Sequence, residues 1–172
     1  MTPEQEVPMV SVIGFTGTRK GMTPEQEKEV DYFLRVLGPP NSVWHGGAIG
    51  ADEQFHELVL CRWPAGVHIC VLPVEHKDRS ERIEPGPWVH IFPPVKNPLE
   101  RNRTIARACL HLICTPKDAS EVLRSGTWAT VRYARRVMRT HTLIYPDGSR
   151  KTFRGEDAHH RFAAKLWKSF PK

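Results

Sequence analysis

The chain has 172 residues, of which 40% are hydrophobic, and a formal net charge of +6 at pH 7. This length is typical of one domain, so we expect a single domain over residues 1–172 with one hydrophobic core. No apolar run approaches the ~20 residues of a membrane span, and the N-terminus has no basic segment followed by an apolar one. We therefore expect a cytoplasmic protein that does not bind a membrane.

The cysteines and the charges narrow the function classes further. The four cysteines form no C-x-x-C pair, so neither a zinc site nor a disulfide framework is indicated, and no metal or other cofactor is predicted. Residues 120–172 hold 12 Lys and Arg against 4 Asp and Glu, whereas residues 1–119 hold 13 against 15. The basic part is typical either of a surface that meets nucleic acid or anionic ligands, or of an ordinary solvated face.

The first elements are a strand and a well-marked helix. An apolar run predicts a buried strand over 9–14, and the stretch GFTGTRKG follows it. A helix is predicted after Thr23, because Pro24 suits the first helical position and Gln26 completes a capping box. Gly and Pro residues at 38–41 end this helix.

The next elements surround a glycine-rich turn. A short strand over 42–44 leads through the stretch HGGAIGAD into a helix over 51–60, where apolar residues recur at helical spacing. A third buried strand is predicted over 67–72. Residues 73–97 are polar and rich in proline, with one short strand at 88–92, and connections of this length often act as lids or binding loops.

The alternation continues to the C-terminus. An Asn-Pro pair opens a helix over 97–108, a strand follows over 110–114, and the stretch RSGTWATVRYARRVMR at 124–139 predicts another helix. The last core strand, over 142–145, ends at a Pro-Asp-Gly turn, and a basic terminal helix is expected over about 157–168.

Strands that alternate with helices indicate an α/β fold. We expect a Rossmann-like, mostly parallel sheet of five to six strands with helices on both faces and a core over about 9–145. In such folds ligands bind at the carboxyl ends of the strands. Three turns follow predicted strand ends, at 14–19, 45–52 and 115–127.

These turns carry the residue types of a phosphate site. Glycine allows an anion to approach backbone N–H groups at a helix start, arginine offers a planar fork, and Ser and Thr add hydroxyls. Neither a Walker loop nor the spacing G-x-G-x-x-G is present. The predicted ligand-binding residues lie in the three turns and at the start of the 97–108 helix: Gly17, Thr18, Arg19, Gly46, Gly47, Gly50, Asp52, Arg101, Asn102, Ser125, Gly126 and Thr127.

Four stretches, in this order, resemble the SLOG superfamily, named for the DNA-processing protein of transformation and the Lonely Guy phosphoribohydrolases. They are GFTGTR, HGGAIGAD, RNRTIARACLHLICTP and SGTWATVRYARR, and they span about residues 10–145. The chain is most similar to the small stand-alone branch related to YspA and YpsA. The resemblance implies a Rossmann-like fold that binds a nucleotide or nucleotide derivative, with the second turn and the SGT turn around phosphate and ribose.

The resemblance leaves catalysis open. Enzymatic members carry a glutamate three residues after the threonine of a GGxGT motif and use it with an arginine to cleave an N-glycosidic bond. Thr130 occupies that glutamate position here, while Arg101 matches the arginine. Asp52 and Glu53, in the neighbouring turn, are the candidate substitute carboxylates.

Three hypotheses follow for the function. The first is a cytosolic binding protein for a nucleotide or nucleotide derivative, and the second is a nucleotide N-glycosidase. The third is single-stranded DNA binding through a basic stripe of Arg132, Arg136 and Arg139, with Trp128 or Tyr133 as stacking residues. The sequence leaves open whether the protein forms a homo-oligomer.

Overall fold

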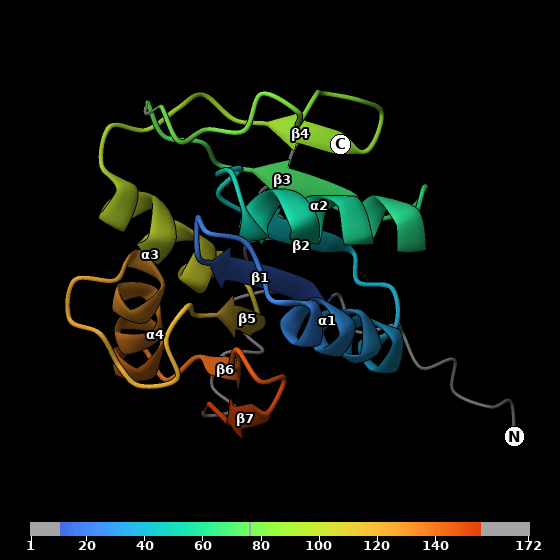
Figure 1. Ribbon diagram of the computed structural model, residues 1–172. Coiled ribbons are helices and arrows are strands. Elements are labelled where there is room, and N and C mark those ends of the chain that lie inside the picture. The colour runs from blue at the N-terminus through green and yellow to red at the C-terminus, as the bar shows by residue number, and fades with distance from the viewer. Residues whose placement is uncertain (1–10, 76, 156–172) are drawn as a thin grey trace, which may run out of the picture.

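The protein forms one seven-stranded sheet with helices on both faces (Figure 1). The computed structural model describes residues 11–75 and 77–155. The strands are β1 (Val12–Gly17), β2 (Ser42–His45), β3 (His68–Val71), β4 (Val89–Ile91), β5 (His111–Thr115), β6 (Thr140–Ile144) and β7 (Arg150–Phe153). The helices are α1 (Pro24–Leu37), α2 (Ala51–Arg62), α3 (Pro98–Ala108) and α4 (Gly126–Arg136).

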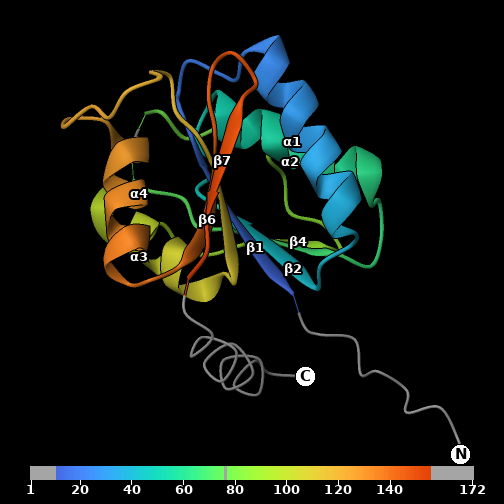
Figure 2. The same ribbon diagram turned by 90° about the horizontal axis from the view of Figure 1, so that it is seen from below.

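The strand order is β4-β3-β2-β1-β5-β6-β7, and all neighbouring pairs are parallel except β6 with β7. Seen from below, α1 and α2 lie on one face of the sheet and α3 and α4 on the other (Figure 2). Each face of the sheet has its own hydrophobic core. On one face Phe55 of α2 stacks on Phe15 of β1, and on the other Trp128 of α4 and Leu112 of β5 belong to the same buried cluster. The α/β, Rossmann-like expectation is confirmed.

The sheet has more strands than the expected five to six, because β7 adds an antiparallel edge strand. The Pro-Asp-Gly turn, expected to end the last core strand, instead joins β6 to β7, and Gly148 adopts a φ of 82° there. Asp-Gly is a hairpin signal, but β7 is mostly exposed and lacks an apolar run of its own. It is held instead by its pairing with β6. The predicted helix at 157–168 lies outside the described residues.

Local capping explains why the helices begin where predicted. Thr23 accepts a hydrogen bond from the Gln26 amide at 3.1 Å, and the Gln26 side chain accepts one from the Thr23 amide at 3.0 Å. Asn97 caps α3 by accepting from the Leu99 amide at 2.9 Å. Such caps satisfy amides that lack an acceptor within the helix.

The direction in which successive strands are added to the sheet reverses at β1. From β1 the chain passes through α1 to β2 on one side, while β5 pairs with β1 on the other side. At the carboxyl end of this pair Gly17 is in register with Thr115. The carboxyl ends of β1 and β5 are thus the topological switch point of the sheet, the place where ligands bind in open α/β folds.

Candidate functional site

The backbone amides of the glycine-rich turn between β2 and α2 are hydrogen-bonded to other groups of the protein. Four of its amides donate to protein acceptors: Gly47 to His45 Nδ1 (3.1 Å), Ala48 to Asp52 Oδ2 (3.2 Å), Ile49 to the Asp78 carbonyl (2.8 Å) and Ala51 to the Thr18 carbonyl (3.0 Å). These amides already have acceptors, so they have little to offer an incoming anion.

The glycines of this turn make room for other protein atoms. A Cβ at Gly47 would lie 2.5 Å from Val71 Cγ1, and Gly47 has a φ of 62°. A Cβ at Gly46 would overlap the Arg101 guanidinium, and one at Gly50 would overlap the Arg19 carbonyl. A side chain at Gly47 or Gly50 would also require a strained positive φ, and one at Gly46 would displace the Arg101 guanidinium, so the physical reason for these glycines is internal packing.

Arg101 ties α3 to the carboxyl ends of β2 and β3. Its Nη1 donates to the Gly46 carbonyl at 2.8 Å and to the Leu72 carbonyl at 3.3 Å, and its Nε donates to Asn102 Oδ1 at 2.7 Å. Burial lowers the pKa of this guanidinium, and the charge of Asp52 opposes that shift. The Arg101 guanidinium, expected to bind phosphate, therefore already donates hydrogen bonds to two backbone carbonyls.

Asp52 is a buried carboxylate whose pKa is influenced by the charge of Arg101. Its carboxylate accepts from the Ala48 amide, and burial raises its pKa while Arg101 and the Ala48 and Gly46 amides oppose the rise. This carboxylate holds the turn in shape.

The connection between β3 and β4 is fastened to the other side of the turn. The Ser80 amide donates to the Gly47 carbonyl at 2.8 Å, and the Ser80 hydroxyl donates to the Glu53 carboxylate. Arg82 pairs with Glu53 at 3.0 Å, and the Ser80 hydrogen bond is the main cause of the lowered pKa of Glu53. A further ion pair joins Arg19 to Asp78. Glu53 and Arg19, both predicted site residues, thus hold this loop.

The first predicted turn meets the start of the third at the switch point. The Thr18 amide donates to the Thr115 carbonyl at 3.2 Å, and a Cβ at Gly17 would lie 2.5 Å from Thr115 Oγ1. That hydroxyl is buried and has no hydrogen-bond partner among the described residues. A buried hydroxyl without a partner is uncommon and is a reason to look for a ligand there.

The third turn opens α4 beside the same strand end. Ser125 is the N-cap, and its hydroxyl accepts from the Trp128 amide at 3.3 Å. Apart from its chain neighbours and the backbone of α4 itself, no atom of the described residues lies within 4 Å of a Cβ built on Gly126, and the first amides of a helix have no acceptor within it. The amides of Gly126 and Thr127 make no hydrogen bond within the described part of the chain, so they remain available as the predicted anion donors.

A buried histidine pair behind the glycine turn had no signal in the sequence. His45 Nδ1 accepts from the Gly47 amide, so its Nε2 carries the proton and donates to His56 Nδ1 at 3.0 Å. Burial is the main cause of the lowered pKa of both rings, which are therefore neutral. The two residues lie on β2 and α2, and only the folded chain brings them into contact.

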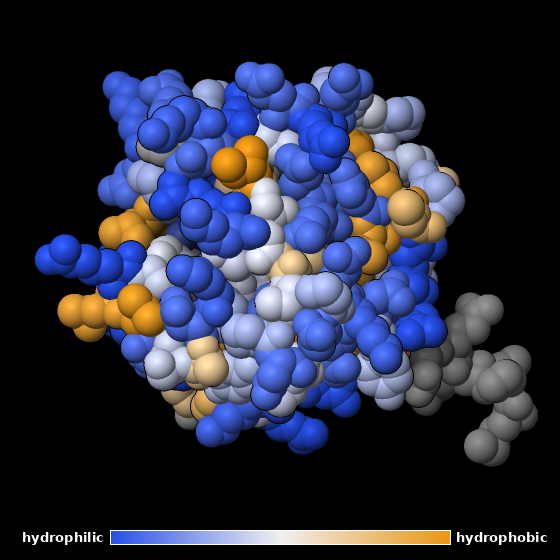
Figure 3. All heavy atoms as spheres, viewed as in Figure 1, coloured by the Kyte–Doolittle hydropathy of each residue, from blue (hydrophilic) through white to orange (hydrophobic). Residues whose placement is uncertain are grey.

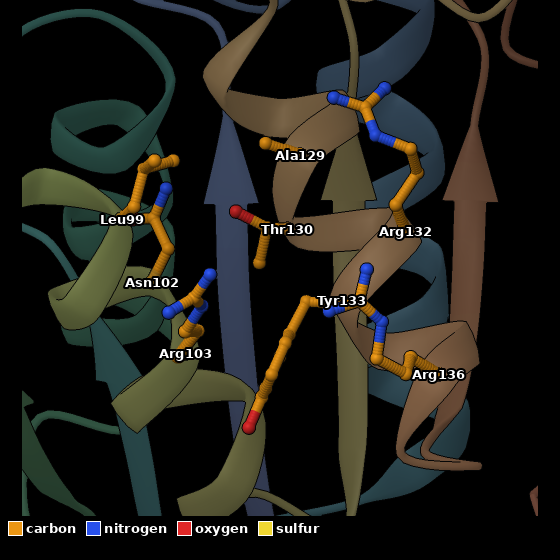
Figure 4. Close-up of a pocket in the computed structure, with 8 residues that line it drawn as sticks. All are labelled: Leu99, Asn102, Arg103, Ala129, Thr130, Arg132, Tyr133 and Arg136. Carbon is orange, nitrogen blue, oxygen red and sulfur yellow. The ribbon is translucent and has the colours of Figure 1, made fainter.

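A cavity of about 160 Å³ lies between α3 and α4 (Figure 4). Asn102 and Arg103 on α3 face Ala129, Thr130 and Tyr133 on α4 across it. Asn102 thus lines this cavity, and its Oδ1 accepts a hydrogen bond from Arg101. Leu99, Arg132 and Arg136 complete the lining.

The predicted basic stripe is wrong at one of its three arginines. Arg139 lies beyond the end of α4 and is buried, where its guanidinium donates to the Ala106 and Arg107 carbonyls at 2.9 Å each. It caps the C-terminus of α3 instead of facing solvent. Arg132 pairs with Glu121 at 3.2 Å, and Trp128 is buried in the core.

Two further findings bear on identity. Within residues 11–75 and 77–155, no helix has the length and apolar character needed to cross a membrane. Neither a scan against protein-family models nor a search of curated proteins gives a match for this chain.

Proposed function

We propose that this protein binds a nucleotide or nucleotide derivative at the carboxyl ends of β1 and β5, in the manner that the SLOG resemblance implies. The observation that carries the proposal is the open start of α4, at Gly126, beside the topological switch point. The positive end of the helix dipole and two free amides favour a phosphate group there.

The proposal gives the two glycine-containing turns different roles. The turn at 45–52 supports the site from behind, since its amides, Arg101 and Asp52 are engaged with one another. Ser125, Gly126 and Thr127 meet the phosphate, and Thr115 supplies a hydroxyl that has no hydrogen-bond partner within residues 11–75 and 77–155.

The test is a bulky substitution at the open glycine. Gly126→Val places its side chain in empty space, so we expect a folded protein whose nucleotide affinity falls at least about tenfold, the equivalent of one charge-assisted hydrogen bond. A panel of nucleoside mono-, di- and triphosphates, screened by thermal shift and followed by calorimetric titration, provides the measurement.

Gly86→Val is the matched control, because a Cβ at Gly86 also meets no atom within 4 Å and this residue lies in the β3–β4 connection. Equal nucleotide affinity in both variants and the natural protein would contradict the proposal, as would a panel in which no nucleotide binds.

A further inference from the structure

We propose that the cavity between α3 and α4 binds the terminal phosphate of a phosphate monoester, at a site separate from the start of α4. This inference does not depend on the proposed nucleotide site. It rests on the charge and the size of the cavity and on the hydrogen-bond donors that line it.

The charge of the cavity is positive and uncompensated. Three of its lining side chains are arginines, and no carboxylate is among the described residues that line it. Glu121 pairs with Arg132, whereas Arg103 and Arg136 make no ion pair or hydrogen bond within the described part of the chain. Two positive charges remain, and a phosphate monoester carries about −1.5 to −2 at pH 7.

The donors surround the cavity from both helices. The Arg103 guanidinium lies over the Tyr133 ring, 5.6 Å from its centroid, and is held there by a cation–π contact. In Figure 4 the Arg136 guanidinium turns back along α4 toward Tyr133. Asn102 accepts from Arg101 through Oδ1, which leaves its amide N–H groups for a ligand.

Tyr133 lines the cavity with its ring. Its side chain is 9% exposed, and its hydroxyl is buried and points away from Asn102 and Thr130 (Figure 4). The ring therefore positions the Arg103 guanidinium, and the hydrogen bonds to a phosphate would come from the arginines and Asn102.

The size of the cavity selects the group that enters. Pockets that enclose whole drug-sized ligands measure about 300–1,000 Å³, well above the 160 Å³ found here. The cavity therefore holds one phosphate-sized group, and the rest of the molecule extends into solvent between the helices.

The experiment measures phosphate binding to the full chain at constant ionic strength. Inorganic phosphate and glycerol 1-phosphate are titrated calorimetrically into the natural protein and the Arg103→Gln/Arg136→Gln variant. Both arginines are exposed and lack hydrogen bonds, so the variant should fold normally. We expect its affinity for both ligands to fall at least about tenfold.

The Lys28→Gln/Lys151→Gln variant removes the same formal charge from exposed positions on α1 and β7, and it should bind as the natural protein does. An equal loss in this control, or no loss in the arginine variant, would overturn the site. An oligonucleotide without a terminal phosphate supplies the diester arm. Competition by it stronger than by glycerol 1-phosphate would overturn the monoester assignment. Gly126→Val should retain the phosphate binding that the arginine variant loses, which separates this test from that of the nucleotide site.

Discussion

At the scale of single residues, the glycines of the 45–52 turn differ from the glycine of α4 in what surrounds them. A Cβ at Gly46 would overlap the Arg101 guanidinium and lie 2.9 Å from Asp52 Oδ2. We expect Gly46→Ala to lower the free energy of unfolding by about 1–3 kcal/mol, because the Arg101 guanidinium must move away from its hydrogen bond to the Gly46 carbonyl. Urea unfolding measures the change, and Gly126→Ala, which adds the same atom in open space, should leave stability within about 0.5 kcal/mol.

The buried histidines predict how stability depends on pH. Burial lowers the pKa of His45 below its ordinary value of 6.5, so the unfolded ring takes up a proton as the pH falls below about 6.5 while the folded ring does not. The free energy of unfolding therefore falls between pH 7 and 5.5. A single such group contributes a slope of up to about 1.4 kcal/mol per pH unit.

We expect His45→Gln to flatten this slope, as measured by urea unfolding at several pH values. His90→Gln, at an exposed position on β4, serves as the control and should retain it. If His45→Gln keeps the natural slope, the pH dependence belongs to other groups.

At the scale of elements, the N-cap of α4 has two proposed roles that a substitution can separate. Ser125→Asp keeps a preferred capping residue and adds a negative charge next to the helix dipole, so stability should stay within about 0.5 kcal/mol. The same charge repels an incoming phosphate, and nucleotide affinity should fall at least about tenfold.

Ser125→Ala is the complementary variant, since it removes the cap without adding charge and should cost about 1 kcal/mol of stability. Thermal unfolding and nucleotide titration are both recorded for the two variants. Ser125→Asp with full nucleotide affinity would mean that the ligand does not approach this helix.

The elements themselves were predictable because their signals are local. Thr23, Asn97 and Ser125 each cap a helix through atoms two or three residues away. The strand count failed at β7, whose stability comes from pairing rather than from its own pattern. The candidate site was harder, because Arg101 meets Gly46 across 55 residues of sequence and its hydrogen bonds there depend on how α3 packs. A glycine that admits a ligand and one that admits an arginine look alike in the sequence.

At the scale of the whole molecule, the surface seen in Figure 3 is mostly hydrophilic, and the basic residues have several different structural roles. Hydrophilic side chains cover most of the face in Figure 3, and apolar atoms project at the margin where the β5–α4 connection lies, with Leu123 83% exposed. Arg132 and Arg135 hold this connection by pairing with Glu121. Positive charge that the sequence assigned to one helical stripe is therefore divided among a helix cap, a loop anchor and the cavity.

The last prediction concerns catalysis. We expect no release of base from nucleoside monophosphates, because Thr130 occupies the position that holds a glutamate in the enzymatic members of the SLOG superfamily, which the sequence resembles. Thr130 is 1% exposed, and its hydroxyl donates to the Gly126 carbonyl at 2.9 Å. The substitute carboxylates are engaged, Asp52 with the glycine turn and Glu53 with Ser80. Loss of one catalytic group commonly lowers the reaction rate by a factor of about 10² or more.

Chromatography of each monophosphate after incubation with the protein is the measurement. Asp52→Asn and Thr130→Glu are assayed in parallel, and urea unfolding verifies that both variants fold. Turnover by the natural protein that disappears in a folded Asp52→Asn variant would identify an enzyme with a relocated carboxylate, whereas turnover gained only in Thr130→Glu would show that a binding site lacks one group for catalysis.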